Sequence, residues 1–315
     1  MKKTFLWILF AVALTYLVRE LLYIGVRKNR IGEYDKLNTI FLKHNNYNCL
    51  VIGSSRAESH FNPRIIDSIT HLDSYNIGLE GATMPFILGG LEAYLVNSKA
   101  PEYVMLNIDF HAFKDNNDTI HRFPRYFPYL SNKKFYHKLK ERDHRFLFFK
   151  WIPLYSLPYF NEQYLNASLR GYFGIENEFD QSFIQGYAPV PPGLTIDVDT
   201  FKYSKFYSNP QEIIFQSLDS IINVCKKNNS KLIFVVSPMY YKGFEAVTNR
   251  NELLQIFKNI AEKYNLGYMD YTSSDFCNDK TLFADPYHSN KKGSILFSEK
   301  FANDLRQYIN NLSVN

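Results

Sequence analysis

The sequence has few cysteines, no internal repeat and no low-complexity tract. Its three cysteines, Cys49, Cys225 and Cys277, are odd in number and far apart. Disulfide frameworks and zinc sites need paired, closely spaced cysteines, so this pattern argues against both. Cys49 and Cys225 lie in or beside apolar stretches, where buried thiols are common. We assign none of the three a catalytic role.

The sequence also has only a small excess of positive over negative charge, with a formal net charge of +5. The basic residues are spread along the chain rather than gathered in a stripe, which argues against nucleic-acid binding. The histidines do not combine with carboxylates at metal-ligand spacing, so we expect neither a metal nor another cofactor. Aromatic residues, in contrast, are abundant, with 27 Phe and 24 Tyr. They favour an aromatic core, with a glycan-binding or membrane-proximal surface as the alternatives.

No apolar run at the N-terminus reaches full membrane-spanning length. The fifteen uncharged residues Thr4–Val18 follow two lysines, whereas a bilayer span needs about 20. Apolar residues resume at Leu21 after two charged residues, and no clear cleavage site follows. We therefore expect an uncleaved signal anchor or transmembrane helix over 1–26 and a linker over 27–47, with a packed amphipathic helix as the alternative. The anchor predicts a single-pass protein of the cytoplasmic membrane, with its main domain on the periplasmic or extracellular side.

From residue 48 to residue 315, short apolar runs alternate with amphipathic segments. Strands are predicted at 49–52, 74–77, 103–108, 231–236 and 267–271. Helices are predicted at 63–69, 84–97, 210–227, 249–264 and 291–311. This alternation indicates an α/β domain with a parallel sheet covered on both faces.

Residues 111 to about 208 interrupt the alternation. They are dense in Phe, Tyr, Pro, Asn and Lys and contain several short candidate helices. A segment of this length is too long for a structureless loop inside a compact domain. We expect an aromatic-rich insertion that forms a lid or cap over the site; additional core or an oligomer contact would fit equally well.

Two short motifs at opposite ends of the chain carry the chemistry. V-I-G-S-S-R-A-E-S-H at 51–60 places serine on the turn after an apolar strand, and A-D-P-Y-H-S-N at 284–290 places Asp285 three residues before His288. Sites in parallel sheets form beyond the carboxyl ends of the strands, where these motifs fall. A serine nucleophile needs a base, and the base needs an orienting carboxylate. The motifs therefore predict a serine hydrolase or acyltransferase.

These residues resemble the SGNH (GDSL-like) hydrolase superfamily, in the divergent form of membrane-anchored envelope proteins. Four blocks carry the resemblance: G-S-S at 53–55, N-I-G-L-E-G at 76–81, L-N-I-D at 106–109 and D-P-Y-H at 285–288. The resemblance covers 48–109 and 231–312. It implies a three-layer α/β/α fold, flavodoxin-like, with a mainly parallel sheet.

The resemblance also implies residue roles. Ser55 would be the nucleophile, His288 its base and Asp285 the orienting carboxylate. The backbone N–H groups of Ser55 and Gly78, with the side chain of Asn107, would form the oxyanion hole.

Some positions depart from the family pattern. Ser54 stands where the family has aspartate, which makes it a rival nucleophile. Asn107 is shifted by one residue from the family asparagine, so its side chain would point to the other face of a strand. Arg56 is a candidate for binding a carboxylate or phosphate of an envelope glycan, or for pairing with a local acid such as Glu58.

The function implied by the resemblance is ester chemistry on a cell-envelope polysaccharide, by removal or transfer of an acyl group such as acetyl. The expected partners are an envelope glycan or acylated carbohydrate as substrate, the membrane through the N-terminal helix, and a membrane acyltransferase. The alternative is a non-catalytic, membrane-anchored envelope scaffold or glycan-binding protein with a degenerate SGNH fold. An esterase directed at lipids is a third reading.

Overall fold

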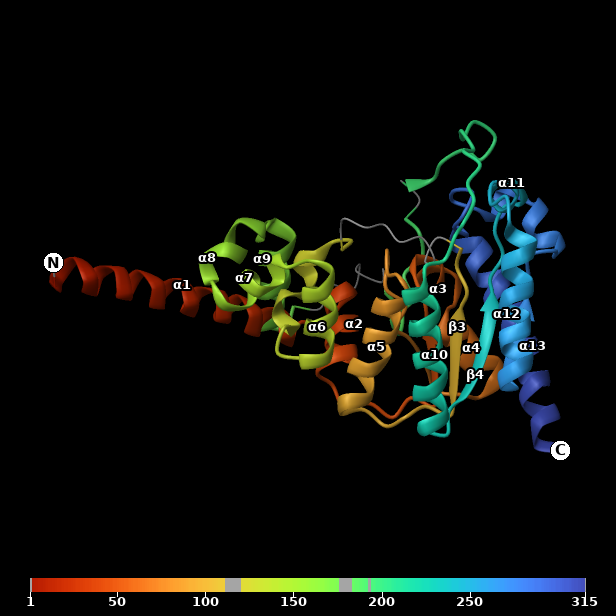
Figure 1. Cartoon of the computed structure of the whole chain (residues 1–315), viewed down its shortest axis with the longest axis horizontal. Coiled ribbons are helices and arrows are strands. Elements are labelled where there is room, and N and C mark those ends of the chain that lie inside the picture. The colour runs from red at the N-terminus through yellow and green to blue at the C-terminus, as the bar shows by residue number, and fades with distance from the viewer. Residues whose placement is uncertain (1, 111–119, 176–182, 192–193, 315) are drawn as a thin grey trace.

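A long N-terminal helix projects from an α/β body (Figure 1). The computed structural model describes residues 2–110, 120–175, 183–191 and 194–314. Parts of the predicted insertion, 111–119, 176–182 and 192–193, lie outside these ranges. The long helix, α1 (Lys2–Lys28), is the one helix among the described residues that is long and apolar enough to cross a membrane.

Five parallel strands form the middle layer of the body. They are β1 (Cys49–Ile52), β2 (Ser74–Asn76), β3 (Tyr103–Asn107), β4 (Lys231–Val236) and β5 (Gly267–Asp270). Their order is β2-β1-β3-β4-β5, and every neighbouring pair is parallel. This is the flavodoxin-like order, in which the winding reverses between β1 and β3 and a crevice opens beyond their carboxyl ends. The predicted three-layer α/β/α fold is confirmed.

Both faces of the sheet are covered, because alternate residues of each strand enter two separate cores. Leu50 and Ile52 of β1 belong to one core, and Cys49 and Val51 belong to the other. Continuous burial of β1 and β3 is typical of parallel strands with helices on both sides.

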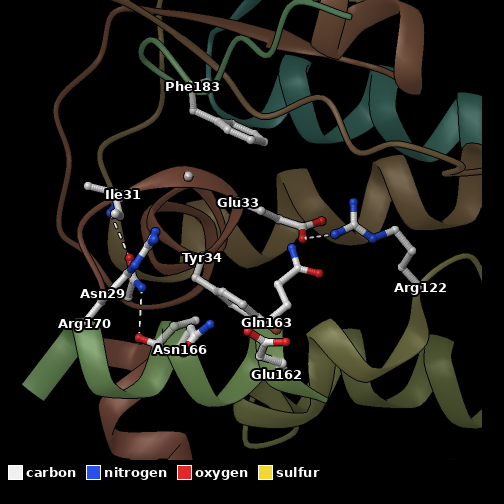
Figure 2. A pocket seen from close by; sticks show the side chains of 12 residues that line it. Asn29, Ile31, Glu33, Tyr34, Arg122, Glu162, Gln163, Asn166, Arg170 and Phe183 are labelled. Carbon is white, nitrogen blue, oxygen red and sulfur yellow. Dashed lines mark hydrogen bonds and ion pairs between the residues drawn. The ribbon is translucent and has the colours of Figure 1, made fainter. Parts of the chain in front are cut away.

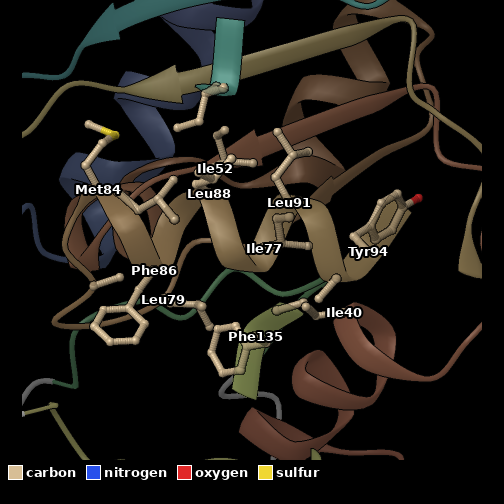
Figure 3. Close-up of a cluster of buried hydrophobic side chains, with 14 of the residues drawn as sticks. Ile40, Ile52, Ile77, Leu79, Met84, Phe86, Leu88, Leu91, Tyr94 and Phe135 are labelled. Carbon is tan, nitrogen blue, oxygen red and sulfur yellow. The ribbon is translucent and has the colours of Figure 1, made fainter. Parts of the chain in front are cut away.

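The helices of the two outer layers follow the strands. They are α3 (Ser55–His60), α4 (Pro63–Thr70), α5 (Met84–Asn97), α10 (Glu212–Lys227), α11 (Tyr241–Glu245), α12 (Arg250–Tyr264) and α13 (Lys291–Val314). Residues of α5, α10 and α12 join the first core, and residues of α3, α4 and α13 join the second. Figure 3 shows the first core, where Met84, Leu88 and Leu91 of α5 point toward Ile52 of β1.

The remaining α-helices and one 3₁₀ segment gather around the base of α1 (Figure 1). They are α2 (Gly32–Phe41), a 3₁₀ segment (Phe123–Tyr129), α6 (Lys133–Arg142), α7 (Arg145–Trp151), α8 (Pro153–Ser156) and α9 (Glu162–Phe173). The helix α2 lies within the segment predicted as a linker, yet most of its residues are buried. Within the insertion, α8 and α9 contact α1 and α6 contacts α5.

Candidate active site

Three side chains from distant parts of the sequence form a chain of hydrogen bonds. The Ser55 hydroxyl Oγ lies 2.8 Å from Nε2 of His288. Nδ1 of His288 lies 2.8 Å from Oδ2 of Asp285. A neutral imidazole that donates from Nδ1 to the carboxylate leaves Nε2 free to accept the serine proton. The structure thus brings together the three residues that the two motifs contribute.

The turn after β1 exposes Ser55 at the start of α3. Gly53 has φ of 151°, and a Cβ there would lie 2.6 Å from Cβ of Ala57, so glycine alone fits this turn. Ser54 occupies the N-cap position of α3 without a capping hydrogen bond from its side chain, and Ser55 is the first residue of the helix. The N–H of Ser55 lies in the first turn, where backbone N–H groups have no acceptor within the helix. It remains a candidate donor for an oxyanion.

Hydrogen bonds within the loop before α13 fix the positions of Asp285 and His288 relative to each other. Oδ1 of Asp285 accepts the backbone N–H groups of Tyr287 at 2.7 Å and His288 at 2.9 Å. Burial alone would raise the pKa of the Asp285 carboxyl, but its hydrogen bond to the His288 ring, the charge on that ring and these two N–H groups outweigh burial and lower the pKa. Asp285 therefore stays ionised and can stabilise a charged His288.

A second histidine, His60, supports the same loop from α3. Burial, assisted by the charges of Arg56 and His288, lowers the pKa of His60 well below its usual value. Its neutral Nε2 accepts the backbone N–H of Ser289, the residue after His288, at 3.0 Å. Sequence analysis gave His60 no role, because nothing in the sequence shows that the end of α3 contacts the C-terminal loop.

A cavity of about 370 Å³ opens beside Ser55 and His288. One wall is polar and includes Glu58, Glu80 and Arg122. The apolar lining residues in the described ranges, which we name the apolar wall, are Phe183, Ala188, Pro189, Val190, Pro191 and Leu194. The volume lies in the range of small-molecule sites. A ligand with one polar and one apolar part fits such walls.

Sequence analysis missed the buried lysine that supports the polar wall. Lys36 of α2 is buried, and its Nζ donates to the carboxylate of Glu58 and, at 2.7 Å, to the carbonyl of Gly78. Burial lowers the pKa of Lys36, while Glu58 opposes that shift. Lys36 thus ties α2 to both the nucleophile helix and the loop after β2. A lysine in a segment read as a linker gave no signal of this role.

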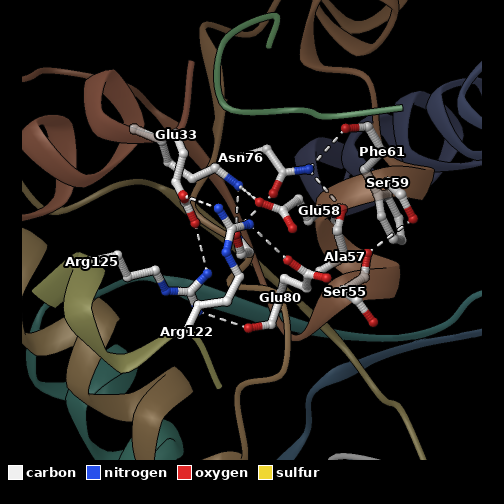
Figure 4. Close-up of polar contacts among 12 residues, drawn as sticks. Glu33, Ser55, Ala57, Glu58, Ser59, Phe61, Asn76, Glu80, Arg122 and Arg125 are labelled. Carbon is white, nitrogen blue, oxygen red and sulfur yellow. Dashed lines mark hydrogen bonds and ion pairs between the residues drawn. The ribbon is translucent and has the colours of Figure 1, made fainter. Parts of the chain in front are cut away.

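Arg122 of the insertion lines the polar wall, and Arg125 contacts the same two glutamates without lining the cavity (Figure 4). Arg122 bridges Glu33 of α2 at 2.7 Å and Glu80 at 3.1 Å. Arg125, which is buried, binds Glu33 at 2.8 Å and donates to the backbone carbonyl of Glu80. Arg122 has φ of 46°, a left-handed conformation that costs a non-glycine residue about 1–2 kcal/mol. The surrounding contacts hold its guanidinium at the cavity in spite of this cost.

Replacing Glu80 by glutamine is expected to change the acid limb of the stability profile. Hydrogen bonding to His121 lowers the pKa of Glu80, and Arg122 lowers it further. Burial opposes both effects, and the pKa falls from 4.5 to about 2. A lowered pKa stabilises the fold above pH 4.5, and this contribution disappears as the pH falls through about 2. The stability difference between wild type and Glu80→Gln should therefore be largest above pH 4.5 and shrink toward pH 2. Chemical denaturation across this range measures it. An equal difference at every pH would contradict the assignment, and exposed Glu299→Gln serves as control.

The predicted substrate residue Arg56 needs correction. Its side chain is 1% exposed and does not line the cavity. It donates to the carbonyl of Ile108 at 2.9 Å, and its Nε lies 3.7 Å from Asp109. Arg56 points into the core because α3 begins at Ser55, so the next residue faces the sheet. Glu58, its suggested alternative partner, instead pairs with Lys36.

The predicted oxyanion hole is also corrected in two of its three donors. The Gly78 N–H donates to Oδ1 of Asn76 at 2.9 Å, so this donor is already used. Asn107 is 1% exposed and does not line the cavity; its Oδ1 accepts the backbone N–H of Ser237 at 3.3 Å, and its Nδ2, the group that would donate to an oxyanion, is buried without a hydrogen-bond partner among the described residues. As the last residue of β3, Asn107 turns toward the end of β4 rather than toward the cavity. The rival nucleophile Ser54 is buried and donates to Asp109, away from His288.

A second cavity of about 480 Å³ lies next to the first, between α2 and α9 (Figure 2). It shares Arg122 and Phe183 with the catalytic cavity. Its remaining polar lining residues are Asn29, Glu33, Glu162, Gln163, Asn166 and Arg170. The two cavities therefore adjoin at a cationic and an aromatic side chain.

Comparison with known proteins identifies no family. No family model matches the sequence, and no curated protein matches it. A crystal structure from Bacteroides fragilis, described as a "putative acylhydrolase", aligns with a TM-score of 0.43 and 13% sequence identity, covering 87% of this chain and 96% of that chain. A similarity this distant decides nothing about activity.

Proposed function

We propose that this chain is a membrane-anchored, SGNH-like serine enzyme that removes or transfers acyl groups, such as acetyl, on a cell-envelope polysaccharide. The observation that carries the proposal is the continuous chain of hydrogen bonds from Ser55 through His288 to Asp285. Nucleophile, base and orienting carboxylate in this arrangement are the minimum that acyl transfer through serine requires.

The walls of the catalytic cavity support an acylated carbohydrate as substrate. Carbohydrate hydroxyls would face Glu58, Glu80 and Arg122, and a short acyl group would contact the apolar wall at Pro189 and Val190. The adjoining cavity, rich in amide and carboxylate side chains, gives room for further sugar units. Both cavities together suit a polymer better than a small free ester.

The reaction would proceed in two steps. Oγ of Ser55 attacks the acyl carbonyl carbon while Nε2 of His288 takes the hydroxyl proton. The ester C–O bond then breaks, and His288 returns the proton to the departing sugar oxygen, which leaves an acyl-serine. Water or a second sugar hydroxyl attacks the acyl carbon of this intermediate while His288 takes its proton, and the bond between the acyl carbon and Oγ then breaks as His288 returns the proton to Ser55. The first acceptor gives hydrolysis and the second gives transfer.

The proposed location follows from α1. Its length and apolar composition suit a single membrane span. The two lysines at its start favour a cytoplasmic N-terminus, and the basic residues Arg27, Lys28 and Arg30 after the span work against this orientation. The catalytic domain would then face the periplasm or the cell exterior, where envelope polysaccharides are found. A membrane acyltransferase that supplies acyl groups would be a suitable partner.

One observation favours the alternative of a non-catalytic envelope scaffold or glycan-binding protein. The N–H of Gly78 and the side chain of Asn107, two of the three donors expected for the oxyanion, are engaged elsewhere or buried. A missing oxyanion donor lowers kcat by about 10²–10³-fold. The cavities would still bind a glycan without efficient turnover.

A fluorophosphonate probe separates the two functions. An activated serine attacks the probe phosphorus and becomes covalently labelled. We expect the full-length wild type in detergent to be labelled and Ser55→Ala to remain unlabelled, with protein amounts matched. Ser54→Ala is the control, since this hydroxyl contacts Asp109 rather than a histidine. Equal labelling of wild type and Ser55→Ala, or none of either, would favour the scaffold.

A further inference from the structure

Exposed apolar side chains are concentrated at the end of the molecule from which α1 projects. Of thirty-three large hydrophobic residues exposed in the described ranges, thirteen lie on α1 and eleven between residues 147 and 175. We name α7, α8, α9 and their connections, residues 145–175, the collar. Its exposed apolar members are Leu147, Phe148, Trp151, Ile152, Leu154, Tyr155, Leu165, Leu169, Tyr172, Phe173 and Ile175. Soluble surfaces rarely carry so large an apolar patch.

The uncharged part of α1 is too short to cross a bilayer alone. Thr4–Val18 contains fifteen residues, which extend about 22 Å at 1.5 Å per residue. The hydrocarbon core is about 30 Å thick. The rest of the apolar thickness must come from the part of α1 that follows Val18, and this is the part against which the collar packs on one side (Figure 1).

Arg19 marks the level at which the collar begins. Its side chain is only 4% exposed, and it pairs with Glu20 at 3.1 Å. It also donates to the carbonyl of Lys150 on α7 at 3.3 Å and lies over the ring of Tyr16. An arginine at membrane depth needs partners that shield it from lipid, and the collar supplies them. Lys150 directly precedes Trp151, whose side chain is 67% exposed.

The collar and α1 form one packed unit. A Cβ at Gly171 of α9 would lie 1.8 Å from the carbonyl oxygen of Gly25, and a Cβ at Gly25 would lie 2.2 Å from Oγ of Ser168. The Tyr172 hydroxyl donates to the carbonyl of Leu21 at 2.6 Å. Small residues at a helix crossing permit this close approach. The collar therefore sits at a fixed level along α1.

We propose that the collar is immersed in the bilayer, in the interfacial layer of the leaflet on the catalytic-domain side. The proposal rests on α1 being a membrane span. Interfacial helices insert about 5–10 Å into the boundary between headgroups and acyl chains, which matches the roughly 8 Å that Thr4–Val18 lacks. Trp151, Tyr155 and Tyr172 belong to the residue types enriched at this boundary. The occupant of the apolar surface is thus lipid, continuous with the lipid around α1.

The two tryptophans of the chain, Trp7 and Trp151, allow a direct test. Full-length protein is reconstituted into bilayers of phosphatidylethanolamine and phosphatidylglycerol, with or without brominated acyl chains that quench tryptophan on contact. Trp7→Phe leaves Trp151 as the reporter of the collar, and Trp151→Phe leaves Trp7 as the reporter of α1. A control lacking both and carrying Leu312→Trp reports the far end of α13, where Leu312 is exposed.

We expect brominated lipid to lower the emission of Trp7 and of Trp151 each by about twofold or more. Aqueous iodide should quench neither, and the Leu312→Trp control should show the reverse. Quenching of Trp151 by iodide but not by brominated lipid would overturn the proposal. Protection of Trp151 from both quenchers would also overturn it, since a second copy of the chain would then cover the collar. If Trp7 also escapes brominated lipid, the anchor fails together with the collar. Adding Ser55→Ala should change none of these results, which separates them from the proposed catalysis.

Discussion

Replacing Ser55 by alanine is expected to lower kcat for an acetyl ester by about 10⁴-fold or more, because the variant has no hydroxyl for His288 to deprotonate. Asp285→Asn should lower kcat by about 10³–10⁴-fold. The asparagine keeps an oxygen for the N–H groups of Tyr287 and His288, but its amide donates where the carboxylate accepted. His288 would then turn its proton-bearing nitrogen toward Ser55. Steady-state release of p-nitrophenol from p-nitrophenyl acetate measures both effects.

Ser54→Ala is the matched control for these variants. Its hydroxyl is buried and donates to Asp109, so its loss should leave kcat within about tenfold of wild type. A large loss of kcat in Ser54→Ala, together with an active Ser55→Ala, would show that Ser54 rather than Ser55 is the nucleophile. Activity retained in Asp285→Asn would show that His288 is oriented by other contacts.

The second large effect concerns stability rather than turnover. Asp109→Ala would remove the carboxylate beside the buried guanidinium of Arg56, whose side chain is 1% exposed. Breaking a buried pair on one side destabilises a protein by about 3–5 kcal/mol, because the remaining charge stays out of water without a counter-charge. Burial already lowers the pKa of Arg56 while Asp109 opposes that shift. Denaturant unfolding of the full chain in detergent, followed by circular dichroism, measures the loss.

A double variant, Arg56→Met with Asp109→Leu, tests whether the charge is the cause. If it is, removing both charges should restore much of the stability lost in Asp109→Ala. A double variant as unstable as Asp109→Ala would show that packing or the Ser54 contact matters more. A loss below about 1 kcal/mol in Asp109→Ala would show that Arg56 is solvated after all.

The fold could be predicted because its signals are local. The strands β1 and β4 are short apolar runs, and α10, the helix before β4, shows regular apolar spacing along its buried face. The structure keeps β1 at Cys49–Ile52, α5 at Met84–Asn97 and β4 at Lys231–Val236, as predicted, and moves one boundary of each other predicted element by one to three residues. The parallel order then requires that the turn after β1 lie at the carboxyl edge of the sheet, where Ser55 is found.

The surroundings of the site could not be predicted, because they depend on contacts between distant segments. Lys36 follows Asp35 in a stretch that reads as polar, and only the docking of α2 buries it against Glu58. Nothing in the sequence separates the roles of Arg56 and Arg122. The position of Arg56 on α3 turns its side chain into the core, whereas the insertion brings Arg122 to the cavity. The Gly78 amide is lost to Asn76 by a side-chain rotamer that no spacing rule specifies.

The glycine contact between α1 and α9 would give the proposed anchor a mechanical role. A domain on a flexible tether sweeps a volume and can act far from its point of attachment. Here Gly25 and Gly171 meet without room for a single methyl group, so the domain would be connected rigidly to α1. The opening beside Ser55 would then be held at a fixed distance from the membrane surface, and only the part of a polymer at that distance would be modified. Position along the strand, rather than chemical identity alone, would select the ester that reacts.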